Sequence, residues 1–344
     1  MHGRPPIPTL PTDISGLTER ERRLERRQVV RGVVGPIIAI AVLTALLWPH
    51  FDEILTAARL ISIEAAIGLI VLHLVALLLR AEAWGRCVAA AGAPVERRLL
   101  HSSSSLRFLA DTVVPTYIGA WVRIALVKRF DRVRAARPGA TPTPTIGQMF
   151  TADGLMLFVE AVITVGLIAI AVFTSSLEWW WFFVFGAAVL AALLILRWLF
   201  RRYRDRDFAR TARVLSDAHD RYVLTGLLAV VLTLQPIRFF IAFTAVGLDP
   251  TASEALLAFL LTTAFGALPI GPGPSSVAAS ATLFAGAGID KTASAGLVLL
   301  ASAVVAAAVY SVYGVFDFSR RARESRANQA GEATATSAST GDST

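Results

Sequence analysis

The sequence predicts an all-α polytopic membrane protein, with about six spanning helices and two re-entrant or broken helical hairpins in an inverted repeat. The first observation is composition: of 344 residues, 55% are hydrophobic and only 17% are charged, unlike an ordinary soluble domain. The second is a set of uncharged runs long enough to cross a bilayer. The third is that two apolar segments are interrupted by proline and glycine at matched positions.

Six apolar runs have the length of a membrane span, which requires about 20 residues in helical form. The first follows a long charged tail and is a full span, so we expect it to remain in the protein rather than act as a cleaved signal. The six runs cover 32–51, 62–79, 153–173, 179–196, 222–248 and 292–316.

Three regions follow from the distribution of charge. Residues 1–28 hold six arginines and four acidic residues, and we expect a solvated tail that fixes orientation. Residues 29–318 form the integral membrane domain. Residues 319–344 begin basic and end in GEATATSASTGDST, a low-complexity composition that predicts disorder.

Basic loops predict the orientation of the chain, because Lys and Arg are enriched in cytoplasmic loops. This rule places both termini in the cytoplasm and the protein in the cytoplasmic membrane. It also explains the net charge of +8 without a nucleic-acid partner. The basic cytoplasmic segments are 80–98, 128–137 and 197–221, and the outer loops, almost free of basic residues, are 49–61, 174–178 and 248–254.

This topology requires residues 99–127 to enter and leave on the cytoplasmic side, and residues 255–289 to enter and leave on the outer side. Both segments contain a helix break with the spacing P-x-x-x-G. In the first, Pro115 is followed by Gly119, and in the second, Pro269 is followed by Gly273. Freed backbone groups in a membrane must be buried in protein or line a wet cavity.

A Gly/Pro turn precedes each break at nearly the same distance. Gly92 lies 23 residues before the first proline, and Gly247 lies 22 before the second. A single P-x-x-x-G pattern arises by chance in chains rich in proline and glycine. The matched spacing and opposite orientation favour an inverted repeat, about 62–173 and 222–316, with a binding site near the midplane.

Ionisable residues at membrane depth are candidates for function. Arg107, Asp111 and Arg123 flank the first break. Arg123 comes four residues after Gly119, where a guanidinium and helix-end amides could hold a phosphate. The alternative is that its side chain snorkels to the cytoplasmic interface.

Two further charged residues lie inside spans, Glu160 and Arg238. We expect them to pair with each other, and the pattern leaves both a structural bridge and a substrate role open. The second break offers only Ser275, Ser276 and backbone amides. His73 lies in an apolar helix, where a hydrogen-bonded packing role is expected rather than a proton relay.

Three stretches resemble the flippase-like transmembrane family, whose best-known relative is the membrane part of lysylphosphatidylglycerol synthase. They read LLLRAEAWGRCVAAAG, LADTVVPTYIGAWVRIALVKR and ALPIGPGPSSVAASATLFAGAGIDKTASAGLVLL, and the resemblance covers about 32–318. It implies a helical membrane domain built around two breaks, with lipid as the substrate class.

The sequence departs from the family pattern at both breaks. In the family the first break reads Pro, a short spacer, Gly-Glu and then Arg, but Ala120 occupies the place of the glutamate here. The second reads Pro, then Gly-Gly-x-Gly with a glutamate soon after, whereas Pro274 and Ser276 stand in that stretch. Asp153 is the one candidate remnant of the acidic-basic pair that usually begins the next span. These departures suggest a divergent member.

The leading hypothesis is a translocase for membrane lipids or a polyprenyl-phosphate-linked envelope precursor. The alternative is a non-catalytic scaffold or partner subunit of an envelope glycosyltransferase or synthase, and a third reading is a secondary transporter for a small solute. We expect no enzyme, because the chain lacks catalytic motifs, and no soluble synthase domain fits in the 26-residue tail. We expect no cofactor, and the single cysteine leaves no cysteine-based zinc cluster.

Overall fold

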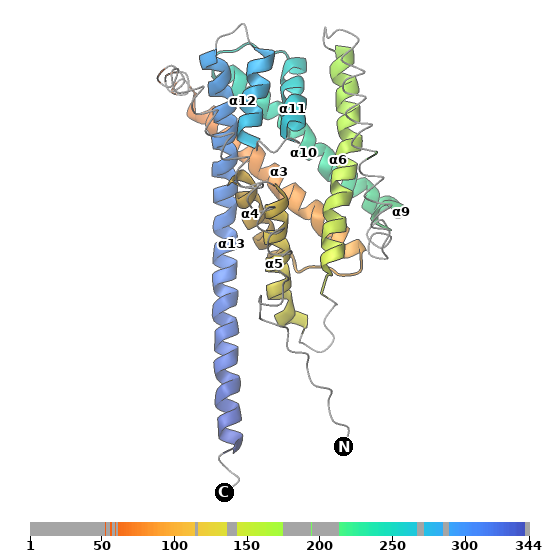
Figure 1. Ribbon diagram of the computed structural model, residues 1–344, viewed down its shortest axis with the longest axis vertical. Helices are drawn as coiled ribbons and strands as arrows, with labels where there is room; N and C mark the ends of the chain where they lie inside the picture. Colours follow the sequence, from red (N-terminus) through yellow and green to blue (C-terminus); the bar gives the residue numbers. More distant parts are fainter. Residues whose placement is uncertain are drawn as a thin grey trace, which may run out of the picture.

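The described part of the chain is entirely helical, as predicted. The computed structural model describes residues 61–113, 116–135, 143–174, 213–266, 272–284 and 289–340, with isolated residues 52, 56, 59 and 194. No strand occurs within these ranges. The main helices, labelled in Figure 1, are α3 (Ile63–Ala90), α4 (Arg97–Val113), α5 (Thr116–Ala135), α6 (Ile146–Thr174), α9 (Arg213–Ser216), α10 (Ala218–Ala245), α11 (Ala252–Gly266), α12 (Pro272–Leu283) and α13 (Ile289–Thr340).

Four of these helices are long and apolar enough to cross a membrane: Ile63–Ala90, Ile146–Thr174, Ala218–Ala245 and Lys291–Arg321. Large apolar side chains on them are exposed, for example Phe173 at 83% and Leu157 at 62%. In a bilayer such side chains face lipid rather than water. The protein is therefore a polytopic helical membrane protein. The expected spans 32–51 and 179–196 lie outside the described residues, apart from residue 194.

Local sequence signals start several of the helices. At the start of α6, Thr145 and Gln148 form a reciprocal pair, in which each backbone N–H donates to the other side chain at 2.8 and 3.0 Å. Thr251 and Glu254 form the same arrangement at the start of α11. These capping boxes satisfy amides that the first helical turn leaves without partners.

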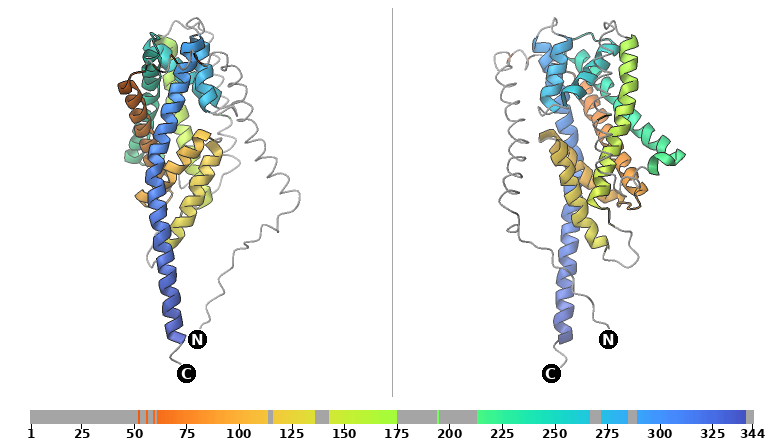
Figure 2. Two further views of the ribbon diagram at one scale, coloured as in Figure 1. Left: turned by 90° about the vertical axis from the view of Figure 1, so that its left-hand side faces the viewer. Right: turned by 45° about the vertical axis from the view of Figure 1, so that its right-hand side comes forward.

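Both predicted breaks interrupt helices in the structure. Helix α4 ends at Val113 and α5 begins at Thr116, while α11 ends at Gly266 and α12 begins at Pro272. Pro115 and Pro269 themselves lie outside the described residues, whereas Gly119 and Gly273 lie in α5 and α12. In each case the two helices pack against each other as a hairpin. Figures 1 and 2 place the α11–α12 hairpin at one end of the molecule and the α4–α5 hairpin beside the middle of α13.

The two glycine turns before the hairpins have matching backbone geometry. Gly92 has φ 85° and Gly247 has φ 76°, and they are the described residues with positive φ. After α3, Ala93 N–H donates to the carbonyl of Val88, and after α10, Leu248 N–H donates to the carbonyl of Phe243. Glycine adopts this left-handed conformation without the steric penalty that a Cβ brings. The two turns thus lead into the two hairpins with the same backbone geometry.

Helix α13 packs against both hairpins and runs the length of the molecule (Figure 1). A Cβ at Gly296 would lie 2.7 Å from Cα of Val277 in α12, and one at Gly314 would lie 2.9 Å from the carbonyl of Ser102 in α4. Both glycines therefore permit close helix–helix contact. Helix α13 also continues to Thr340, so the helix extends through the tail that composition predicts to be disordered. Alanine, arginine and glutamate in its continuation favour helix.

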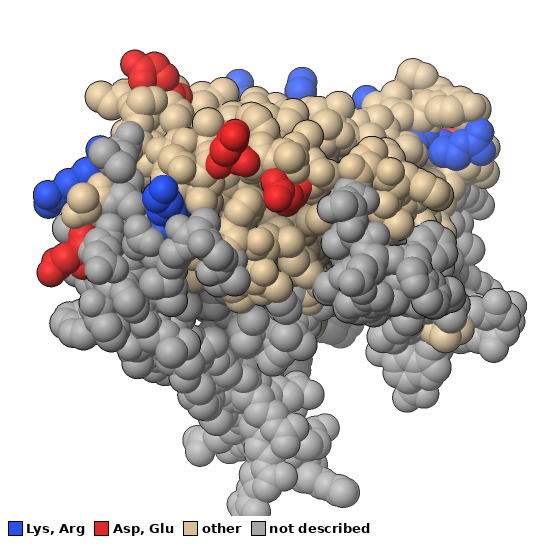
Figure 3. Space-filling model, turned by 90° about the horizontal axis from the view of Figure 1, so that it is seen from above, with Lys and Arg blue, Asp and Glu red and all other residues tan. Residues whose placement is uncertain are grey.

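The end of the molecule that carries the α11–α12 hairpin is shown in Figure 3. On the part of this face that the structure describes, Lys, Arg, Asp and Glu are scattered among uncharged residues and form no large basic patch. Apart from Lys291, the basic residues of α13 begin at Arg320, where the span Lys291–Arg321 ends.

Candidate functional site

A cluster of four charged side chains lies beside the first break, built from α4, α5 and α6. Asp153 Oδ1 accepts a hydrogen bond from Arg107 Nη1 at 2.6 Å and another from Arg123 Nη2. Arg107 Nε also donates to Asp111 Oδ2 at 3.3 Å, one helical turn along α4. Asp153 therefore joins both arms of the α4–α5 hairpin to a spanning helix. We call these four residues the break cluster.

Arg123 is the most enclosed member of the break cluster. Its side chain is 1% exposed, and its guanidinium carbon lies 3.8 Å from the centre of the Trp84 ring on α3. A guanidinium above an indole face is attracted by the ring quadrupole, and more strongly when water is excluded. This placement rules out the alternative in which Arg123 snorkels to the interface.

Gly119 allows the two helices of the hairpin to approach closely at the cluster. A Cβ at this position would overlap the Asp111 carboxylate and would lie 3.0 Å from the carbonyl oxygen of Arg107. The next residue, Ala120, is also buried. It occupies the place where the family pattern expects glutamate, so the carboxylates here come from α4 and α6 instead.

The formal charges of the break cluster cancel, because two arginines face two aspartates. Hydrogen bonding is nevertheless incomplete within the described part of the chain. In the break cluster and the adjoining Trp84, four buried polar atoms have no partner among the described residues: Trp84 Nε1, Asp111 Oδ1, Arg123 Nε and Asp153 Oδ2. Buried polar atoms are normally satisfied by protein or water. The cluster and Trp84 together therefore retain two donors and two acceptors for water or a polar ligand.

Arg238 forms a second buried polar group, in the middle of α10. Its Nη1 donates to His73 Nδ1 at 2.7 Å and to Gln235 Oε1 at 2.8 Å, and its Nη2 donates to Ser302 Oγ at 3.0 Å. The contact agrees with the packing role predicted for His73. Among the described residues, no carboxylate forms an ion pair with Arg238, and its Nε has no partner.

The expected pairing of Glu160 with Arg238 is wrong. Glu160 Oε1 instead accepts from Arg80 Nε at 2.9 Å and Nη2 at 2.7 Å, which joins α6 to α3. The side chain of Glu160 is 13% exposed and that of Arg80 is 39% exposed. The sequence predicts that Arg80 follows the span 62–79, but α3 continues to Ala90, so Arg80 lies inside a continuous helix.

The second break places hydroxyl groups rather than charges inside the protein. Ser275 is fully buried and Ser276 is 5% exposed. Ser276 Oγ donates to the carbonyl of Gly296 on α13 at 3.3 Å. The structure therefore places these two candidate residues at the contact between α12 and α13, whereas the break cluster is built from α4, α5 and α6. In the part of the chain that the structure describes, no three His, Cys, Asp or Glu side chains gather to hold a metal ion.

Comparison with protein families agrees with this architecture. The profile described as the lysylphosphatidylglycerol synthase TM region matches residues 33–318. The chain belongs to this family. Comparison with curated proteins and with solved structures gave no match. The match to the family of the lysylphosphatidylglycerol synthase TM region covers α3 to α12 and the first part of α13.

Three contributors to these sites were not among the residues selected from sequence. Asp153 could be noticed in the sequence, since it begins the span after the first break and is the candidate remnant of an acidic-basic pair. Trp84 and Arg80 carried none, because a tryptophan and an arginine near a helix end usually mark the membrane interface. The rotation of α3 that turns Trp84 inward comes from tertiary packing.

Proposed function

We propose that this protein translocates the headgroup of a membrane lipid, or of a polyprenyl-phosphate-linked envelope precursor, across the cytoplasmic membrane. Both termini lie in the cytoplasm in this proposal, as the basic loops predict. The acyl or prenyl tail stays in lipid while the headgroup passes between the two hairpins. The protein acts as a carrier with no chemical step and no cofactor.

The observation that carries the proposal is the break cluster with the adjoining Trp84, which together hold four buried polar atoms without partners among the described residues. A phosphate-containing headgroup accepts hydrogen bonds, which Arg123 Nε and Trp84 Nε1 can donate. Hydroxyl or amino groups of a headgroup can donate to Asp111 Oδ1 and Asp153 Oδ2. Placing such groups at a helix break inside a membrane is costly unless the site is wet or occupied.

Two other regions contribute to the proposed path. Arg238 brings a buried cation without a carboxylate among the described residues, and an anionic headgroup would supply the missing charge. At the second break, Gly273 lies in the first turn of α12, ahead of Ser275 and Ser276, where helix-end backbone amides are suited to phosphate oxygens. The two hairpins lie at different levels along α13 (Figure 1), as expected if each opens towards a different leaflet.

The proposal is tested by reconstituting the full chain into vesicles with fluorescent phosphatidylglycerol, and separately with a fluorescent polyprenyl phosphate. Translocation is measured by the fraction of label that becomes accessible to an added reductant. Arg123→Ala and Arg238→Ala should abolish translocation, while Arg129→Ala, which removes an exposed arginine of α5, should not. Only preparations of monodisperse protein are compared. Wild-type protein that moves neither lipid would contradict the proposal.

A second candidate is a non-catalytic membrane scaffold for an envelope glycosyltransferase or synthase. The observation in its favour is that the charges of the break cluster already balance, as in a structural ion-pair network. If Arg123→Ala and Arg238→Ala both complement a deletion fully, the translocation path fails and the scaffold is supported. Loss of complementation in both variants, with normal protein levels, supports translocation.

A further inference from the structure

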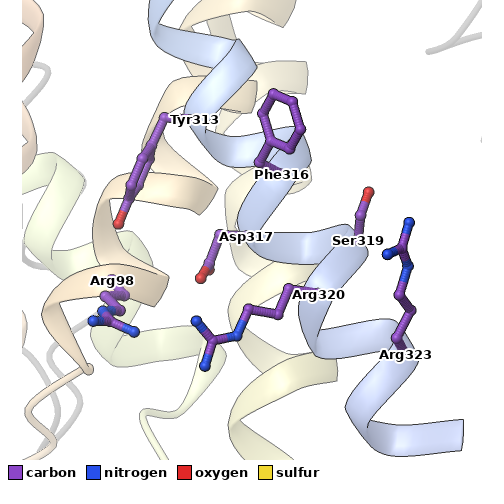
Figure 4. A pocket seen from close by; sticks show the side chains of 7 residues that line it. All are labelled: Arg98, Tyr313, Phe316, Asp317, Ser319, Arg320 and Arg323. Carbon is purple, nitrogen blue, oxygen red and sulfur yellow. The ribbon is translucent and has the colours of Figure 1, made fainter.

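An open pocket of about 660 Å³ lies between the first turn of α4 and the distal part of α13 (Figure 4). Three arginines line it, Arg98, Arg320 and Arg323, together with one aspartate, two aromatic residues and a serine. In Figure 4 the guanidinium of Arg320 and the hydroxyl of Tyr313 point towards the side where Arg98 lies. None of these residues belongs to the break cluster or to the Arg238 group.

The pocket has an excess of positive charge. Its lining carries three arginines against Asp317 alone, a formal charge of +2. That aspartate is already engaged, because it accepts from Arg321 Nε at 2.7 Å and from Ser102 Oγ at 2.8 Å. Arg98 and Arg323 form no ion pair with any residue that the structure describes. The pocket is therefore suited to an anion.

The position of the pocket on α13 fixes its depth in the membrane. The uncharged run 292–316 is 25 residues long, which at 1.5 Å per residue covers the hydrocarbon core of about 30 Å. Arg320 and Arg323 follow one to two turns later, at the level of the headgroups. Phe316 is 72% exposed and Tyr313 is 43% exposed, as aromatic side chains at a membrane interface are.

We propose that this pocket binds the phosphate of an anionic phospholipid in the adjoining leaflet. Arg98 and Arg320 hold the phosphate oxygens, since guanidinium groups match phosphate geometry. Arg323, whose guanidinium points away from Arg98 in Figure 4, adds positive charge at the edge of the pocket. Phe316 lies against the glycerol and upper acyl region. Arg98 precedes Arg107 by nine residues, or about 13 Å along α4. The pocket is thus a separate lipid site that holds whether or not the protein translocates lipid.

The test uses the full chain in phosphatidylcholine vesicles with and without phosphatidic acid. Native mass spectrometry after extraction measures how many lipids of each kind remain bound. Wild-type protein should retain phosphatidic acid in preference to phosphatidylcholine. Arg98→Gln combined with Arg323→Gln should weaken retention about tenfold or more, because charge-assisted hydrogen bonds are lost. The matched control combines Arg129→Gln with Arg221→Gln, which removes the same charge at exposed positions of α5 and α10.

Equal retention in the pocket variant and the control variant would overturn the proposal, as would no preference for phosphatidic acid. All four positions are exposed, so folding should be unaffected, and a thermal unfolding curve checks this. A second arm titrates inorganic phosphate into lipid-free protein in detergent. Saturation by inorganic phosphate at the concentrations where phosphatidic acid binds would assign the pocket to a soluble phosphate and overturn the lipid assignment.

Discussion

Arg123 on α5 lies with its guanidinium carbon 3.8 Å from the ring centre of Trp84 on α3, and both side chains are buried. This contact joins the broken hairpin to a spanning helix. The arginine also donates to Asp153, so it contacts both an aromatic face and a carboxylate. A buried cation so enclosed depends strongly on its partners, which leads to the first prediction.

Asp153→Asn should destabilise the protein by about 3–5 kcal/mol, because it leaves Arg107 and Arg123 buried without their shared carboxylate. The measurement is thermal or denaturant unfolding in detergent. Adding Arg123→Met should recover part of the loss. The control is Asp220→Asn, whose partner Arg86 lies 3.6 Å away in a pair where both side chains are 41% exposed. This exposed pair should contribute about 0–1 kcal/mol, and equal losses in the two variants would contradict the assignment.

Gly119→Ala should destabilise the hairpin by about 1–3 kcal/mol, since the new methyl group overlaps the Asp111 carboxylate and crowds the Arg107 carbonyl. Gly226→Ala on α10 is the matched control, because a Cβ there meets no atom within 4 Å. That control should leave the melting temperature unchanged or slightly higher. The comparison fails if the two substitutions shift the melting temperature alike.

Glu160 should be energetically coupled to Arg80 and not to Arg238. A double-mutant cycle of Glu160→Gln with Arg80→Gln should give a coupling of about 0.5–3 kcal/mol, because the two side chains share hydrogen bonds. The same cycle with Arg238→Gln should give less than about 0.5 kcal/mol. Unfolding free energies of the single and double variants provide the measurement, and the reverse order would restore the pairing expected from sequence.

Gly92→Ala and Gly247→Ala should each cost about 1–2 kcal/mol, the penalty of a left-handed conformation for a residue with a Cβ. Neither position has an atom within 4 Å of the added methyl group, so steric crowding does not contribute. Gly68→Ala in α3 has equally open surroundings without positive φ, and it should cost nothing. Similar losses at positions 92 and 247 would also support equivalent roles in the two halves.

The features predicted correctly from sequence depend on local chemistry. Apolar runs predicted the four spans that the structure describes, because hydrophobic length decides them, and proline with glycine predicted both breaks and both turns. The partners of buried charges were not predictable in the same way. Glu160 faces Arg80 because of how α3 and α6 are rotated, and rotation depends on packing along the whole helix.

The same reasoning explains the result at Arg123. Its position in sequence after the helix break allowed either a buried or a snorkelling side chain. Only the packing of the hairpin against Trp84 and Asp153 decides between the two. The first break could therefore be located from sequence, but the composition of its cluster could not. From sequence, Asp153 could be identified only as the candidate remnant of the acidic-basic pair in the family pattern.

Helix α13 touches Val277 of α12 through Gly296 and the serine-rich face of α4 through Gly314. No side chains separate the backbones at these two contacts. A shift of either hairpin would therefore move α13 with it or disrupt the packing between them. Helix α13 therefore couples the position of the α11–α12 hairpin to that of the α4–α5 hairpin. Bulky substitutions at these glycines would uncouple the two hairpins while leaving every charged residue in place.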